Sequence, residues 1–144
     1  MQGVRVKRAT GLNKVDETSD SDPYFLARIG SNGSTWKEKL RKSEIPEFKS
    51  KTIDDDNNPT WDAEFGFMPS EGLEITLMIY DKNKGHSRVL KVDTFLGEAT
   101  IQIPKGGSSE EMEYTLTGKG CKGTVTVEFF VSEGPLEPRN CKQR

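Results

Sequence analysis

The chain has 144 residues, enough for one domain with a hydrophobic core. Its 21 basic and 23 acidic residues give a formal net charge of −2, so we expect no nucleic-acid partner. No apolar run approaches the length of a membrane span, and the N-terminus carries no apolar signal segment. Nothing in the chain predicts secretion, although a fragment of a secreted protein would look the same.

The residues that usually carry catalysis or structural metal binding are scarce. Two cysteines, Cys121 and Cys141, are too few for a disulfide framework or a zinc site, and we expect free thiols. His86 is the only histidine, and no paired Ser or Cys signature accompanies it. The sequence therefore argues against an enzyme.

Alternating apolar and polar residues, rich in β-branched and aromatic side chains, recur between turn residues, without a long helical period. This pattern predicts an all-β protein, an eight-stranded antiparallel β-sandwich with its loops gathered at the ends. The expected strands are residues 3–9, 22–29, 48–53, 61–68, 73–81, 95–103, 112–117 and 123–131. We expect a domain over residues 1–132 and a flexible tail or linker over residues 133–144, which contain Pro135 and Pro138.

Oxygen-bearing side chains cluster where the expected strands end. Asp16 and Asp22 lie between the first two strands, and the run 54–58 precedes the fourth strand. The run 81–83 follows the fifth strand, and Asp93 precedes the sixth. Each cluster alone is typical of a polar turn. Together they predict a calcium site, because calcium takes about six to eight oxygen ligands from more than one loop.

Five short motifs resemble the C2 domain in order and spacing. They are Gly11-Leu12 with Asp16, Ser21-Asp22-Pro23-Tyr24-Phe25, Asn58-Pro59-Thr60-Trp61-Asp62, Ile79-Tyr80-Asp81-Lys82-Asn83, and Asp93-Thr94-Phe95-Leu96-Gly97. The resemblance covers about residues 3–131. It implies a sandwich whose three loops at one end bind calcium and dock on phospholipid. The first strand leads directly into the first calcium loop, which resembles the permuted (type II) topology of phospholipases and novel protein kinases C.

The resemblance also implies which residues hold the metal. They are Val15 through a backbone carbonyl, Asp16, Asp22, Asp55, Asp81, Lys82, Asn83 and Asp93. Asn83 stands where many members have a second Asp. Asp93 lies four residues before Gly97, whereas many members carry an Asp three residues before it, at the position of Thr94. Both departures resemble the cytosolic phospholipases, and the number and affinity of the ions stay open.

The third loop offers candidate contacts with lipid. Val89 and Leu90, flanked by Arg88 and Lys91, either insert among the head groups or fold back on the sandwich. The loop is longer than a compact sandwich requires, which is typical of functional or disordered loops.

A basic strand offers a second contact. Lys49 and Lys51 alternate on the third expected strand, so both should point from one face. In several C2 domains such a face is implicated in phosphoinositide binding. The alternative is a solubilising face, because acidic residues such as Glu47 interrupt the charge.

The leading prediction is a calcium-dependent phospholipid-binding module, in which calcium on the loop carboxylates acts as an electrostatic switch at an anionic membrane. Such a module would be cytoplasmic and would join the membrane peripherally when calcium rises. One alternative is a calcium-independent module for phosphoinositides or a protein partner. Another is the targeting domain of a larger lipid enzyme or pore-forming protein.

Overall fold

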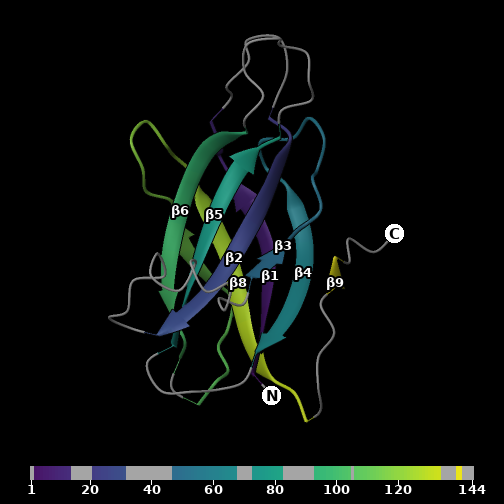
Figure 1. The fold of residues 1–144 in the computed structure, drawn as a ribbon, viewed down its shortest axis with the longest axis vertical. Coiled ribbons are helices and arrows are strands. Elements are labelled where there is room, and N and C mark those ends of the chain that lie inside the picture. Colours follow the sequence, from purple (N-terminus) through teal and green to yellow (C-terminus); the bar gives the residue numbers. More distant parts are fainter. Residues whose placement is uncertain are drawn as a thin grey trace.

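The computed structural model describes residues 2–13, 21–31, 47–67, 73–82, 93–104, 106–133 and 139–140. All regular structure in these ranges is β-strand (Figure 1). The strands are β1 (Gln2–Thr10), β2 (Pro23–Ser31), β3 (Glu47–Lys49), β4 (Thr60–Phe67), β5 (Leu73–Asp81), β6 (Thr94–Gln102), β7 (Met112–Thr115), β8 (Thr124–Val131) and β9 (Arg139–Asn140). The expected all-β fold is confirmed. In the same ranges no helix is long and apolar enough to cross a membrane.

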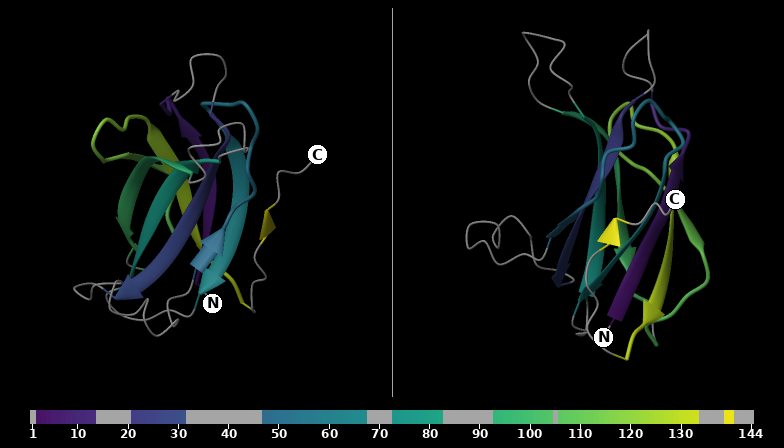
Figure 2. Two further views of the ribbon diagram at one scale, coloured as in Figure 1. Left: turned by 45° about the horizontal axis from the view of Figure 1, so that its top comes forward. Right: turned by 90° about the vertical axis from the view of Figure 1, so that its right-hand side faces the viewer.

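The strands form two antiparallel sheets that pack face to face, as the side view in Figure 2 shows. One sheet has the order β7-β8-β1-β4-β9 and the other the order β3-β2-β5-β6. β1 pairs with β4 along one edge and with β8 along the other, so both edges of β1 are hydrogen-bonded to other strands of the sheet. Because β1 then leads directly into the first loop, the expected permuted topology is confirmed.

Alternation of side chains builds the core between the sheets. On β4, Trp61, Ala63 and Phe65 are buried, while the residues between them point outward. Trp61 packs against Phe25 of the opposite sheet in a T-shaped arrangement, with the ring centroids 5.1 Å apart. Burial of one such aromatic side chain contributes about 1.5–3 kcal/mol, and the facing rows together fix how the two sheets lie on each other.

β3 is shorter than the sequence predicted, because it ends at Lys49 instead of residue 53. The chain nevertheless continues beside β2. Ser50 N donates to Phe25 O at 3.0 Å, and Ser50 Oγ accepts from Phe25 N at 2.9 Å. A side chain therefore takes the place of a backbone group in the ladder, and the regular strand stops.

Part of the predicted tail is paired with the sandwich. Arg139 and Asn140 form β9, which pairs antiparallel with Glu64 and Ala63 at the outer edge of β4. At these two residues the chain forms a strand, where the sequence predicted a flexible tail or linker. Two residues are too few to show an alternating pattern, so nothing in the sequence indicated this strand. The domain boundary near residue 132 stays a prediction.

Candidate calcium and membrane site

Three loops with candidate ligands lie at one end of the sandwich. β1 and β5 end there, and β2, β4 and β6 begin there, at the top of Figure 1. The described parts of these loops are residues 11–13 and 21–22, residues 50–59, and residues 82 and 93. The fold thus brings the three oxygen-rich segments to the same end, as the sequence predicted.

Backbone N–H groups position the carboxylates of these loops. Asp22 N donates to Asp81 Oδ1 at 2.8 Å, which links the first loop to the third. Asp55 N donates to Asp22 Oδ1 at 2.7 Å, which links the second loop to the first. Lys82 N donates to Asp22 O at 2.9 Å and continues the β2–β5 ladder past the strand end. A series of hydrogen bonds from backbone N–H groups to carboxylates therefore links Asp55, Asp22 and Asp81.

Two asparagines of the second loop also bind the first loop. Asn57 Oδ1 accepts from Ser21 N at 2.9 Å, and Asn57 O accepts from Leu12 N at 3.1 Å. Asn58 Oδ1 accepts from Gly11 N at 2.7 Å. Sequence reasoning missed this role, because an Asn-Pro pair is common in turns. The amides hold the first loop at both of its ends.

Asp93 contacts a tyrosine side chain, whereas the carboxylates of Asp22 and Asp81 bind backbone N–H groups. The Tyr24 hydroxyl donates to Asp93 Oδ2 at 2.5 Å. Burial, followed by this hydrogen bond and the negative charge of Asp93, raises the pKa of Tyr24. The phenol is therefore neutral at physiological pH and can act as a donor. Sequence reasoning missed this contact, since nothing in the spacing indicates which loop residue the Tyr24 hydroxyl reaches.

The basic strand residues differ in their surroundings. The Lys49 ammonium lies over the Tyr24 ring, 4.9 Å from its centroid, in a cation–π contact. Lys51 is exposed but follows the end of β3, so the predicted strand alternation does not extend to it. Beside them Arg28 Nε binds Glu47 Oε2 at 2.6 Å, and this ion pair offsets part of the positive charge.

The oxygen atoms offered by these loops are of the chemical type that calcium binds. Asp22, Asp55 and Asp81 offer carboxylate oxygens from three loops, the donor type that calcium prefers. In the described ranges no group of three or more His, Cys, Asp or Glu side chains lies close enough to hold a metal ion. These residues alone therefore do not complete a coordination sphere. The other residues predicted for the metal or lipid lie outside the described ranges: Val15, Asp16, Asn83, Arg88, Val89, Leu90 and Lys91.

The sequence matches the family model of the C2 domain over residues 3–116. The chain belongs to the C2 domain family. Because C2 domains are binding and targeting modules, this membership defines the class of protein.

Solved structures share the fold. A C2 domain of plant Extended Synaptotagmin 1 has 19% identity and a TM-score of 0.68, over 89% of this chain and 90% of that one. Human GIVD cytosolic phospholipase A2 has 22% identity and a TM-score of 0.64, over 95% of this chain but 18% of that one. A calcium-bound structure of two C2 domains of Extended-Synaptotagmin 2 has 19% identity and a TM-score of 0.66, over 89% and 44% of the two chains.

Proposed function

We propose that this C2 domain binds anionic phospholipid membranes when calcium is held by its three loops. The main support is the hydrogen-bond series in which Asp55 N binds the Asp22 carboxylate and Asp22 N binds the Asp81 carboxylate, because it links residues of all three loops. Asp16, Asn83 and the carbonyls of Val15 and Lys82 would complete the set. The domain would be cytoplasmic and would join the membrane peripherally as calcium rises.

Charge explains why calcium would control binding. Without the ion, Asp16, Asp22, Asp81 and Asp93 concentrate negative charge at the loop end, and this charge repels an anionic bilayer. Bound calcium supplies positive charge and open coordination positions for lipid phosphate. The repulsion acts over about 8 Å at physiological ionic strength, so the switch works only close to the membrane.

Such a switch needs a second attachment, since each electrostatic term is modest. Val89 and Leu90 would insert among the head groups while Arg88 and Lys91 meet phosphates. The exposed side chains of Lys49 and Lys51 would add basic charge beside the loops, in reach of phosphoinositides. Each of these contacts is part of the proposal.

A calcium-independent interaction module is the second candidate. Backbone N–H groups bind the Asp22 and Asp81 carboxylates, and these hydrogen bonds link the described parts of the three loops through protein groups alone. The exposed side chain of Lys82 also follows Asp81 directly and reduces the negative charge. A phosphoinositide or a protein would then be the partner.

The targeting role in a larger lipid enzyme also stays a proposal, because the chain spans 18% of the human phospholipase.

Co-sedimentation with phosphatidylserine vesicles separates the candidates. We expect the natural chain to sediment with vesicles in calcium and to stay in the supernatant in chelator. Asp22→Asn with Asp81→Asn should lose the calcium-dependent fraction, because both anchoring carboxylates become neutral. Equal binding in calcium and in chelator would exclude the switch and favour the second candidate.

A matched control removes the same charge elsewhere. Glu110→Gln with Glu133→Gln also removes two negative charges, and both side chains are exposed near the end of the sandwich opposite the loops. This variant should sediment like the natural chain in both conditions. If it loses calcium dependence as well, net charge alone explains the result and the loop site is not supported.

A further inference from the structure

The register of β5 and β6 decides on which side of the sheet each loop carboxylate lies. Ile79 and Leu96 are buried in the core, so both point inward. Asp81 follows Ile79 by two residues, and Thr94 precedes Leu96 by two residues and pairs directly with Asp81. Because side chains alternate along a strand, Asp81 and Thr94 share the inner side of the sheet at its loop end.

Asp93 belongs to the opposite side. It lies one residue before Thr94, and by the same alternation it shares the outer side with Phe95. Phe95 pairs with Tyr80, and Tyr80 pairs with Tyr24 on the next strand. The three rings form a row across the outer face, with centroids 5.7 Å apart for Tyr24 and Tyr80 and 5.6 Å apart for Tyr80 and Phe95.

Resting on the proposed function, we propose that Tyr24 is a positioning residue that holds the Asp93 carboxylate on the outer face, outside the calcium coordination sphere. The hydroxyl of Tyr24 donates to Asp93 Oδ2 at 2.5 Å, and the Tyr24 side chain is buried, so the ring has little freedom to release it. The ligand position beside Asp81 then belongs to the neutral Thr94. The calcium site then has one carboxylate fewer than it would have if Asp93 were a ligand. The register that places Asp93 on the outer face therefore determines the affinity of the site for calcium.

Lys49 supports this assignment. Its ammonium lies 4.9 Å from the centroid of the Tyr24 ring whose hydroxyl binds Asp93. The cation at the ring face and the carboxylate at the hydroxyl therefore hold the same tyrosine from two sides. Lys49, Tyr24 and Asp93 thus form a unit that joins β3, β2 and the entry to β6 on the outer face.

Calorimetric titration of the whole chain with calcium tests the proposal. Asp93→Asn should change the dissociation constant by less than about threefold, whereas Asp81→Asn should weaken binding by more than about tenfold, because only Asp81 loses a ligand charge. Thr94→Asp should tighten binding by about tenfold, since it places a carboxylate beside Asp81. Equal losses for Asp93→Asn and Asp81→Asn, or no gain for Thr94→Asp, would overturn the proposal.

Thermal melting without calcium tests the role of Tyr24. Tyr24→Phe and Asp93→Asn should lower the melting temperature by similar amounts, and the double variant should lose little more, because one hydrogen bond is removed in each case. Tyr80→Phe is the matched control, since its hydroxyl reaches only Met78 Sδ at 4.0 Å in the described ranges. Additive losses would overturn the positioning role. If the natural chain binds no calcium, the proposed function fails. The inference about Asp93 is then tested separately, because it still predicts that Thr94→Asp gains calcium binding.

Discussion

At the scale of single residues, Asp55 has two separable roles. Its φ of +53° lies in the left-handed region, which side chains other than Asn and Asp rarely adopt. This conformation accompanies the hydrogen bond from Asp55 N to Asp22 Oδ1 at 2.7 Å. The backbone of Asp55 thus positions a carboxylate of another loop, while its own side chain is exposed and is a candidate ligand.

Substitution of Asp55 separates these roles. Asp55→Val should lower the free energy of unfolding by about 1–2 kcal/mol, because a β-branched residue is strained at this φ. Asp55→Gly keeps the N–H group and relieves the strain, so its free energy of unfolding should stay within about 0.5 kcal/mol of the natural value. Urea denaturation measures both. Equal stability of the two variants would show that the left-handed conformation is unimportant.

Residue positions differ in how far the sequence could predict them. The positions of Asp22 and Asp81 could be predicted from motif spacing, because each residue lies at the end of an alternating strand. The partner of Asp93 does not follow, since it depends on a bulge between Ile79 and Tyr80 that shifts the register by one residue. A shift of one residue moves a side chain to the other face, and spacing to Gly97 alone cannot show where the bulge lies.

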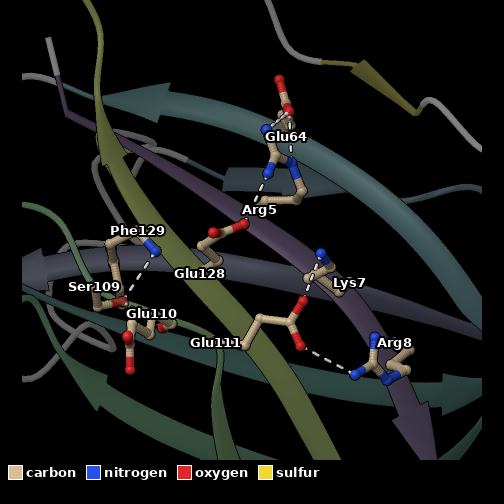
Figure 3. A network of polar contacts seen from close by, with 9 residues as sticks. All are labelled: Arg5, Lys7, Arg8, Glu64, Ser109, Glu110, Glu111, Glu128 and Phe129. Carbon is tan, nitrogen blue, oxygen red and sulfur yellow. Dashed lines mark hydrogen bonds and ion pairs between the residues drawn. The ribbon is translucent and has the colours of Figure 1, made fainter.

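At the scale of strands, the outer face of β1 is held by charges. Arg5 lies opposite Glu64 on β4 and Glu128 on β8, and it binds both carboxylates, as Figure 3 shows. Lys7 and Arg8 share Glu111 in the same view. The two ion pairs of Arg5 tie β4, β1 and β8 together on the face away from the core.

Replacement of Arg5 should measurably destabilise the domain. Arg5→Met keeps much of the apolar stem but leaves Glu64, 17% exposed, without its cation, so we expect a loss of about 1–2 kcal/mol in the free energy of unfolding. Arg8→Met is the control, because Arg8 and Glu111 are each 42% exposed, and should cost about 0.2–1 kcal/mol at most. Guanidinium would screen the pair, so urea is the suitable denaturant. Equal losses for the two variants would contradict the network.

Strands were predictable wherever alternation was long. Leu73, Ile75, Leu77 and Ile79 alternate along β5, and this strand has the predicted bounds. The end of β3 and the presence of β9 could not be predicted in this way. The Ser50 side chain ends the β3 ladder, and β9 has two residues. Short edge strands depend on which partner edge is open, and a single sequence does not show that.

At the scale of the whole molecule, alternation and turn spacing predicted the sandwich and the grouping of its loops. The antiparallel order then places the ends of β1 and β5 beside the starts of β2, β4 and β6. What one sequence could not supply is the set of loop-to-loop hydrogen bonds, such as those of Asn57, because they join residues with no periodic relation. The strand end at which each loop begins was therefore more predictable than the hydrogen bonds that join the loops.

Calcium should stabilise the whole domain if the loops bind it in the folded state only. The stabilisation follows from mass action and reaches about 2.7 kcal/mol when free calcium is 100-fold above its dissociation constant. For a chain of 144 residues we expect a rise of about 2–4 °C in melting temperature per kcal/mol. Differential scanning calorimetry over a calcium series measures this rise. Asp22→Asn with Asp81→Asn should show no rise, and Glu110→Gln with Glu133→Gln should show the full one. A melting temperature independent of calcium in the natural chain would contradict loop binding, whatever the vesicle assay shows.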